Sequence, residues 1–435
     1  MAVTSPGRPT FREVFAVREF RALWAAELLS QLGDQLARVS LAVLVYQRTS
    51  SALLTGLTYA LTYLPSLLGG VLLGGLADRY ARREVIVTVD LLRAVLVGLM
   101  AVPGAPFPAL CLLLVGMTTL SGPFKAAQLA LLADVLSGDR YVLGLSVRHM
   151  TIQSAQVAGF LAGGVLTQAV GPSSGLGLDA LSFAASAALV GFGVRRRHAP
   201  APSTASGATR STAGGPALVW RHPGLRSLTG LAWLAGCYIA PEGLAAPYAD
   251  AVGAGTAVAV GVIMASDPVG SVIGALVFGR FVSDETRERA LAPLALLAGL
   301  PLVLCVFRPG LVVSALLFAV SGALATGYHM QLGASFVRLL PASAKAQGLG
   351  VMSSGLITVQ GLGTLTGGAV AELTGTANAV ALAGAGGILL GARPAWVWTR
   401  ESRAARLPRP PRTRADRGFE TEPREEVRQM RGRDQ

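Results

Sequence analysis

Two stretches of the sequence place oppositely charged side chains inside long apolar runs, where they could carry protons or bind a charged solute. Asp34 and Arg38 lie four residues apart in "LLSQLGDQLARVSLAVLVY", and Asp90 and Arg93 lie three apart in "VTVDLLRAVLV". On a helix each pair shares one face and can form an ion pair. An ionisable group inside a membrane costs about 2.5–3.5 kcal/mol or more, so each one needs a reason. We treat both pairs as candidates for coupling or substrate binding, with a structural ion pair as the alternative.

A further carboxyl, Glu242, lies in "YIAPEGLAAPYA", close to Pro241 and Pro247 and with no Lys or Arg within one helical turn. Prolines interrupt the hydrogen bonds of a helix, which suits a bent helix that lines a cavity. An apolar medium penalises the charged form of a carboxyl that has no partner. Glu242 is therefore a candidate proton carrier.

The composition indicates which class of protein holds these groups. Of 435 residues, 52% are hydrophobic and only 14% are charged, whereas soluble proteins carry about 25% charged residues. The chain is therefore predicted to be an integral membrane protein. Its net charge of +13 is concentrated between apolar runs and near the C-terminus, so we expect no nucleic-acid partner. Three isolated cysteines predict neither a disulfide nor a metal site, and residues 1–21 show no cleavable signal peptide.

A bilayer core of about 30 Å is crossed by roughly 20 apolar residues in a helix. On this basis the sequence predicts an all-α integral membrane fold with twelve transmembrane helices, in two six-helix halves. The predicted spans are 22–45, 52–77, 85–103, 107–128, 142–170, 175–194, 228–249, 256–279, 289–306, 310–332, 346–371 and 375–392. The predicted regions are the N-terminus 1–21, the first bundle 22–194, a linker 195–227, the second bundle 228–399 and a disordered basic tail 400–435.

Basic residues gather in the loops at one end of these spans. The loops after the even-numbered spans carry most of the arginines, including the run 195–197, while the opposite loops carry only Arg48 and Arg308. Cytoplasmic loops of membrane proteins are enriched in Lys and Arg. We therefore expect a multi-pass protein of the inner or plasma membrane with both termini in the cytoplasm. The linker, rich in Pro, Ser, Thr and Gly, is expected to be cytoplasmic as well.

An internal repeat supports the division into two halves. When the sequence is shifted by 204 positions without gaps, residues 136–171 align with residues 340–375. The identical positions, in first-half numbering, are Leu136, Gly144, Leu145, Val147, Gln156, Gly159, Leu161, Gly163, Gly164 and Gly171. The fifth and eleventh spans are therefore predicted to be equivalent, as in secondary transporters built from two parallel six-helix halves.

The stretch "GGLADRYARR", residues 74–83, lies between the second and third spans. It resembles the loop at this position in the major facilitator superfamily, and Ala81 stands where that family usually has glycine. The positions that match the motif are Gly74, Asp78, Arg79, Arg82 and Arg83. The resemblance implies a secondary transporter in which Asp78 helps to latch the two halves on the cytoplasmic side. For the arginines, a topology anchor without a moving part is the alternative.

Several phrases, such as "GDQLAR", "PEGLAAPYA" and "GFLAGG", are similar to an actinobacterial efflux branch that includes macrolide and siderophore exporters. This resemblance implies export of small amphipathic or drug-like molecules, with the proton as coupling ion. In "GFLAGG" the small residues Gly159, Gly163 and Gly164 predict close helix packing. The same stretch resembles the antiporter motif of the family, but Phe160 stands where that motif has proline. The fourth span also lacks the arginine that is typical of proton-coupled exporters.

Other classes of protein fit the sequence less well. An ATP-driven pump would need the loop Gly-x4-Gly-Lys-Ser/Thr, and neither of the two lysines, Lys125 and Lys345, lies in one. The four histidines have no metal-ligand spacing, so we expect no enzyme activity, no cofactor and no metal. A monomer in the lipid bilayer with a small-molecule substrate is predicted. Solute uptake or uncoupled transport by the same fold remains an alternative, and a receptor or scaffold would not explain the repeat.

Overall fold

The computed structural model describes residues 10–197, 214–341 and 344–406, and within these ranges it consists of helices and short connections without strands. The first half contains α1 (Phe11–Ala16), α2 (Arg18–Thr49), α3 (Ala52–Ala60), α4 (Leu64–Leu73), α5 (Leu76–Arg79), α6 (Arg82–Met100), α7 (Phe107–Thr119), α8 (Ser121–Val135), α9 (Asp139–Val170) and α10 (Pro172–Gly193). The second contains α11 (Gly214–Arg221), α12 (Pro223–Ala232), α13 (Ala235–Tyr238), α14 (Ala240–Gly243), α15 (Ala245–Ala251), α16 (Ala257–Phe281), α17 (Asp284–Leu297), α18 (Leu300–Leu304), η1 (Cys305–Phe307), α19 (Gly310–Leu339), α20 (Lys345–Thr374) and α21 (Thr376–Arg406).

These helices form the twelve membrane crossings that the sequence predicts. Eight helical stretches of the described chain are long and apolar enough to cross a bilayer by length and composition alone. The other four crossings are α6, α9, α12–α15 and α20, which are richer in polar residues and glycine or are divided into short helices. Broken helices and polar groups at membrane depth are tolerated where protein buries them.

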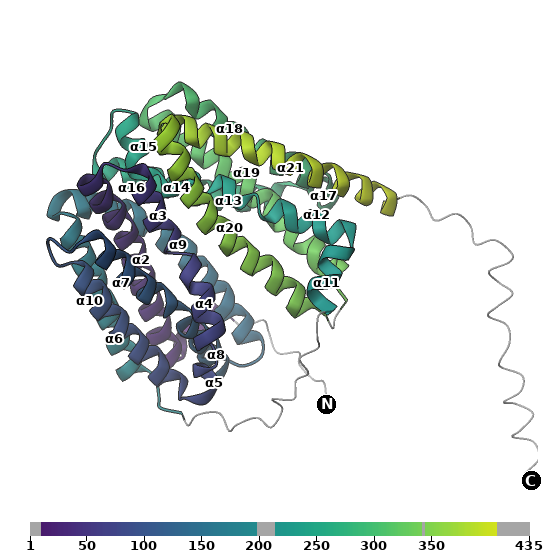
Figure 1. Cartoon of the computed structure of the whole chain (residues 1–435). Helices are drawn as coiled ribbons and strands as arrows, with labels where there is room; N and C mark the ends of the chain where they lie inside the picture. The colour runs from purple at the N-terminus through teal and green to yellow at the C-terminus, as the bar shows by residue number, and fades with distance from the viewer. Residues whose placement is uncertain (1–9, 198–213, 342–343, 407–435) are drawn as a thin grey trace, which may run out of the picture.

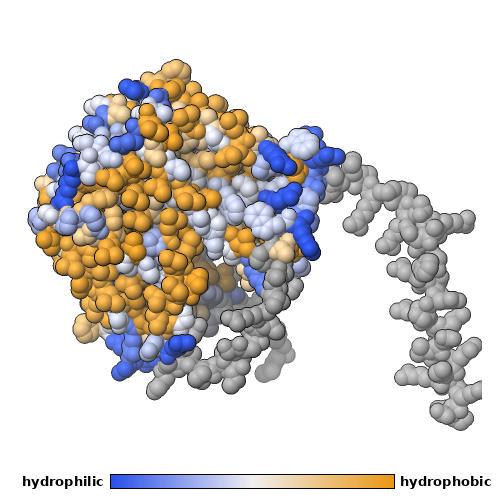
Figure 2. All heavy atoms as spheres, in the orientation of Figure 1, coloured by the Kyte–Doolittle hydropathy of each residue, from blue (hydrophilic) through white to orange (hydrophobic). Residues whose placement is uncertain are grey.

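The outer surface of the bundle is suited to lipid. Hydrophobic residues cover its wall in a broad belt, and hydrophilic residues gather toward the margins (Figure 2). Among the exposed hydrophobic side chains, Phe192 and Val71 are 90% and 85% exposed. Apolar surface exposed on this scale marks a membrane or protein contact rather than a surface in water.

The two halves meet at one end of the molecule and diverge toward the other (Figure 1). They approach each other around α3, α14, α15 and α16, and they separate toward α5 and α11 (Figure 1). We call these the closed end and the open end. Arg82 and Arg83 begin α6, and Arg280 and Arg338 end α16 and α19, all at the open end. The basic end of the protein is therefore also the end at which the halves are apart.

The repeat found in the sequence is confirmed by equivalent contacts in the two halves. A Cβ added to Gly144 would lie 2.4 Å from Cδ1 of Leu136, and one added to Gly348 would lie 2.7 Å from Cδ1 of Leu340. Both members of the second contact follow their counterparts by 204 positions. The start of the fifth span of each half therefore packs on the turn before it in the same way.

The predicted bend around Glu242 is confirmed, because the seventh crossing is divided into α12, α13, α14 and α15. Pro241 lies in the first turn of α14, where a missing N–H is tolerated. Leu244, between α14 and α15, leaves the helical region with φ −109° and ψ 14°. The breaks place Glu242 in a short helix at the junction of the two halves.

The ends of the second half differ from the prediction. The last crossing continues through Pro394 to Arg406, well beyond the predicted limit of 392, so the start of the tail at 400 was also wrong. A Cβ on Gly230 of α12 would lie 3.2 Å from Cγ of Pro394, so the proline packs against α12 inside the bundle. The linker contains helix α11 and the start of α12, and the remainder, 198–213, lies outside the described residues, as do 407–435.

Candidate functional site

A buried hydrogen bond between the two halves forms the centre of the candidate site. The Tyr59 hydroxyl on α3 donates to Oε2 of Glu242 on α14 at 2.5 Å, and both residues are 4% exposed. The breaks in the seventh crossing present the carboxyl at this depth, and Tyr59 comes from the last turn of α3, before the second crossing is itself interrupted. A carboxyl in this position can exchange a proton or bind a cationic group. Its hydrogen bond to Tyr59 forms only when the two halves are close together.

Arg38 of α2 brings a positive charge to this centre. Its guanidinium carbon lies 5.9 Å from the ring centre of Tyr59 and 5.6 Å from that of Tyr63, and it interacts electrostatically with Glu242. The expectation that Glu242 lacks a nearby cation was therefore wrong. Sequence distance concealed this neighbour, although Arg38 and Glu242 are equivalent positions of the repeat, 204 residues apart.

Neither of the predicted ion pairs is formed within the described residues. The guanidinium nitrogens of Arg38 are not within 4.0 Å of the carboxyl oxygens of Asp34, and the same holds for Arg93 and Asp90. Sharing a helix face permits a contact, but in each case neighbouring helices offer the arginine other partners. The alternative of a structural ion pair therefore does not account for either pair.

Asp90 and Arg93 instead bond to separate helices. The Ser186 hydroxyl on α10 donates to Oδ2 of Asp90 at 2.7 Å, and Nη2 of Arg93 donates to Ser121 at 2.6 Å. The Arg93 guanidinium also lies 4.8 Å from the ring centre of Phe183. Asp90 is fully buried and Arg93 is 4% exposed, so they connect α6 to α10 and α8 inside the first half.

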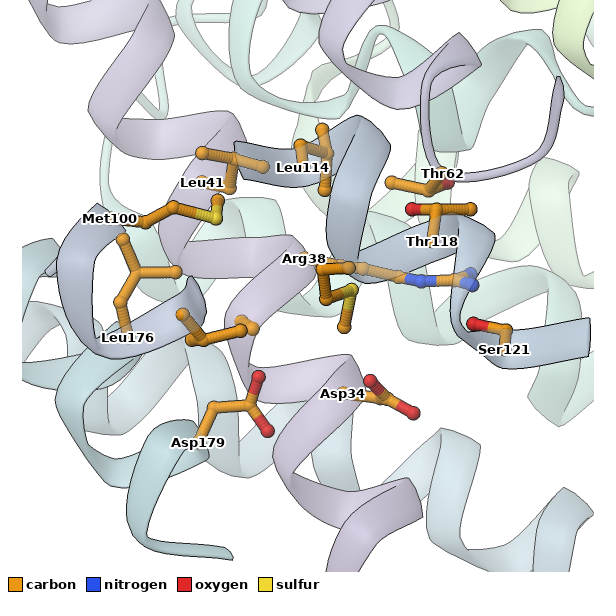
Figure 3. A pocket seen from close by; sticks show the side chains of 13 residues that line it. Asp34, Arg38, Leu41, Thr62, Met100, Leu114, Thr118, Ser121, Leu176 and Asp179 are labelled. Atoms are coloured by element: carbon orange, nitrogen blue, oxygen red, sulfur yellow. The ribbon is translucent and has the colours of Figure 1, made fainter. Parts of the chain in front are cut away.

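Asp34 and Arg38 line a cavity inside the first half (Figure 3). Its volume is about 60 Å³, and its polar lining comes from α2, α7, α8, α10 and the break between α3 and α4. The polar residues of this lining are Asp34, Arg38, Thr62, Thr118, Ser121 and Asp179. Asp179 is fully buried.

The loop motif contacts its own half at the open end. Arg82 forms an ion pair of 2.5 Å with Asp134 on α8, and Arg83 donates to the carbonyl of Gly191 on α10. Among the described residues, a Cβ on Gly74 would meet only the carbonyl of Gly70, one turn earlier in the same helix. The close approach to the fourth crossing occurs earlier, since a Cβ on Gly69 would lie 1.8 Å from the carbonyl oxygen of Thr119.

The motif has two further charged residues, Asp78 and Arg79. Arg79 is exposed at the end of α5, whereas the side chain of Asp78 lies outside the described residues. The contacts of Arg82 and Arg83 therefore define the motif's engagement in this conformation, in which the open end is apart.

The three glycines of α9 face two different partners. Cβ atoms added to Gly159 and Gly163 would lie 2.7 Å from Cβ of Gln35 and 3.0 Å from Cα of Leu36, both on α2. One added to Gly164 would lie 2.8 Å from the carbonyl oxygen of Ala257 on α16, in the other half. The first two glycines thus serve packing within the first half, and Gly164 serves the closed end.

Hydrogen bonds at the closed end follow the symmetry of the repeat. Oε1 of Gln168 at the end of α9 accepts from the backbone N–H of Ala257, the first residue of α16, at 3.0 Å. Oε2 of Glu372 at the end of α20 accepts from the backbone N–H of Leu53 at 3.2 Å and from the Ser51 hydroxyl at 3.1 Å, at the start of α3. Gln168 and Glu372 are 204 positions apart. Each half therefore caps a helix of the other.

A third bond lies on the axis that relates the halves. The Tyr46 hydroxyl on α2 donates to Oδ2 of Asp250 on α15 at 3.0 Å, and these two positions are again 204 apart. An interaction between equivalent positions can form only where an approximate twofold axis passes between them. Arg38 and Glu242 meet the same condition deeper in the molecule.

Sequence reasoning also missed a buried ion pair inside the first half. Nε of Arg148 on α9 lies 2.7 Å from Oε1 of Glu27 on α2, and Glu27 is 5% exposed. Nη2 of Arg148 donates to the side chain of Gln128 on α8 at 3.1 Å. The partners are 121 residues apart, so no helical spacing could have indicated the pair.

Comparison with known proteins is consistent with this architecture. The family model described as Major Facilitator Superfamily matches residues 23–306. A comparison with curated proteins gives no match.

Solved transporter structures share the fold at low sequence identity. A bacterial homologue of the human lysosomal transporter Spinster, in an inward-facing and occupied conformation, is 14% identical with a TM-score of 0.69, over 88% of this chain and 96% of that one. The nucleoside transporter NupG is 13% identical with a TM-score of 0.70, over 87% and 99%. A peptide transporter POT in complex with sulfate is 17% identical with a TM-score of 0.68, over 91% and 97%.

Proposed function

The chain belongs to the major facilitator superfamily, and from this premise we propose that it exports small amphipathic or drug-like molecules by alternating access, coupled to the proton gradient. As a member of this family it is a multi-pass membrane transporter of a small molecule. Export, the proton as coupling ion, and a relation to macrolide and siderophore exporters are the parts that we propose.

The closed end is the observation that carries the proposal. Gln168 and Glu372 cap helices of the opposite half, while the halves diverge at the other end (Figure 1). Contacts of this kind can be broken and replaced by contacts at the open end when the halves rock about the central site. We propose that the open end is cytoplasmic, so that this conformation faces inward.

For the coupling site we propose Glu242 with Tyr59 and Arg38, assisted by Asp34, Asp90 and Arg93 in the first half. Glu242 lies at the junction of the halves, where a change in its charge acts on both. A ligand shifts a conformational equilibrium only by its different affinity for the two states. Replacing a proton by a cationic substrate at this carboxyl would supply that difference.

Transport into inverted membrane vesicles tests the proposal. A panel of amphipathic cations and neutral macrolide-like solutes is offered with and without an imposed pH gradient, acidic inside the vesicle. Accumulation that requires the gradient supports proton-coupled export, and the same vesicles without the protein are the control. If the solute reaches only equal concentrations inside and outside the vesicle, with or without the pH gradient, the protein is an uncoupled facilitator.

The proposed orientation predicts opposite labelling of the two ends. In a variant without Cys111, Cys237 and Cys305, a cysteine at Ser283 of the open end should resist an impermeant thiol reagent in intact cells. A cysteine at Pro103 of the closed end should react readily, because both positions are exposed. Permeabilised cells should label both, and the reverse pattern in intact cells would overturn the orientation.

The proposed latch predicts a conformational effect of Asp78→Asn. If Asp78 stabilises contacts that form when the open end closes, the variant should fold normally, transport more slowly and populate the inward-facing state more. Thiol accessibility at the open end measures that population. Arg79→Gln is the companion variant: an anchor role alone would leave turnover unchanged in both.

A further inference from the structure

Asp179 of α10 is a fully buried carboxyl at the margin of the cavity in Figure 3. Its Oδ1 accepts a hydrogen bond from the Ser182 hydroxyl at 3.1 Å. Among the residues that the structure describes, its Oδ2 has no hydrogen-bond partner, although it is screened from solvent. Buried polar atoms in proteins are almost always bonded, so an orphaned carboxyl oxygen inside a membrane bundle requires an explanation.

Close packing fixes Asp179 beside α2. A Cβ added to Gly33 would lie 2.4 Å from Oδ1 of Asp179 and 2.1 Å from Oγ of Ser182. One turn earlier on α10, a Cβ added to Gly175 would lie 2.1 Å from Oγ of Ser40. These small residues let the two helices touch at the level of Asp34, and both carboxyls line the same cavity (Figure 3).

The cationic side chains around Asp179 make their contacts with other residues. On α6, Asp90 and Arg93 both interact with it electrostatically, but Arg93 donates to Ser121. On α2, the carboxyl of Asp34 repels that of Asp179, and Arg38 interacts with both Asp34 and Glu242. On α8, the exposed Lys125 interacts with Asp34. None of these cations forms an ion pair with Asp179 in the described chain, and the membrane interior penalises a carboxylate left in that state.

The cavity supplies a route for a proton. One water molecule needs about 10–15 Å³ of this kind of volume and two or more polar partners, and the cavity has about 60 Å³. Its hydroxyl lining includes Thr118 and Ser121. The guanidinium of Arg38 also lines it, which disfavours a metal cation in the same space.

We propose that Asp179 is a proton-binding residue of the first half, which exchanges its proton with Asp34 through water in this cavity. The proton forms an O–H bond at Oδ2 of Asp179 and leaves from the same atom, so no other reactant is required. The inference deepens the proposed proton coupling, because it adds a second proton site apart from Glu242. The described residues that line the cavity all belong to the first half, so proton binding there can respond to rearrangement of that half alone.

Infrared difference spectroscopy of the protein in lipid nanodiscs, titrated across the neutral range without any substrate, tests the inference. The wild type should show the band of a protonated carboxylic acid, and Asp179→Asn should lose one such component and one bound proton per molecule. Asp179→Glu should keep a shifted band. Asp139→Asn, which alters an exposed residue at the open end, is the matched control and should match the wild type.

Asp34→Asn should move the titration of the Asp179 band without removing it. An unchanged spectrum in well-folded Asp179→Asn would overturn the inference, and so would a band that sodium abolishes at constant pH. Failure of the proposed function gives a different result: vesicle transport would ignore the pH gradient while the Asp179 band still titrates.

Discussion

Glu242→Gln is expected to abolish accumulation driven by a pH gradient while substrate binding persists for neutral solutes. The amide has nearly the same shape as the carboxyl and can still accept from Tyr59, but it cannot release a proton. One pH unit is worth about 1.4 kcal/mol, so a one-unit gradient supports up to about tenfold accumulation per exchanged proton. The variant should fall to equilibration, measured as the ratio of internal to external solute in inverted vesicles.

Two companion variants make this result specific. Glu285→Gln removes one member of an exposed ion pair with Arg289, which is worth little in water, and should transport as the wild type. Tyr59→Phe removes the donor to Glu242 and should alter the pH dependence of transport without abolishing it. If Glu242→Gln accumulates solute normally while Asp34→Asn does not, the coupling site belongs to α2.

The sequence predicted the parts of the fold that depend on local patterns. Apolar runs defined the twelve crossings, and the repeat indicated equivalent halves. Pro241 and Pro247 indicated a break in the seventh crossing, which α13 to α15 display. Pro394 was misleading, because packing against α12 lets the helix continue through it.

The candidate site was only partly accessible to the same reasoning. Helical spacing brought Asp34 to Arg38 and Asp90 to Arg93, but partners on other helices decided the contacts of Arg93. Tyr59, which binds Glu242, could not be found from spacing because it lies 183 residues away. The repeat did contain a usable signal: positions 204 apart in the first crossing of each half, such as Arg38 and Glu242, meet where the halves join.

Pairs of glycines lie at the contact between the two halves. At the closed end, a Cβ on Gly56 would lie 3.1 Å from Cα of Gly368, and one on Gly261 would lie 2.8 Å from Cα of Gly164. At each of these two helix–helix contacts, a pair of glycines from opposite halves lets the backbones touch. Rocking must separate these surfaces, so side chains introduced there should act on the conformational equilibrium more than on the fold of either half.

Gly368→Val is therefore expected to drive the closed end apart. The added Cβ would lie 2.9 Å from the carbonyl oxygen of Ala52 in the present conformation, and overpacking typically costs about 1–3 kcal/mol. If only this state bears the cost, the ratio of states shifts by roughly five- to 150-fold toward the outward-facing one. Gly368→Ala should shift it in the same direction by less.

Spin-label distances measure the shift directly. Labels at Gln47 and Thr374 report on the closed end, and labels at Ser137 and Ser283 on the open end; all four positions are exposed. In Gly368→Val the first distance should lengthen and the second should shorten. Gly350→Val is the matched control on the same helix, since no atom of the described residues lies within 4 Å of its added Cβ. Distances in a folded Gly368→Val variant that equal those of the wild type would contradict this prediction. They would show that the contact between α20 and α3 is not the joint of the transport cycle, because a side chain that blocks this contact would leave the equilibrium between the two states unchanged.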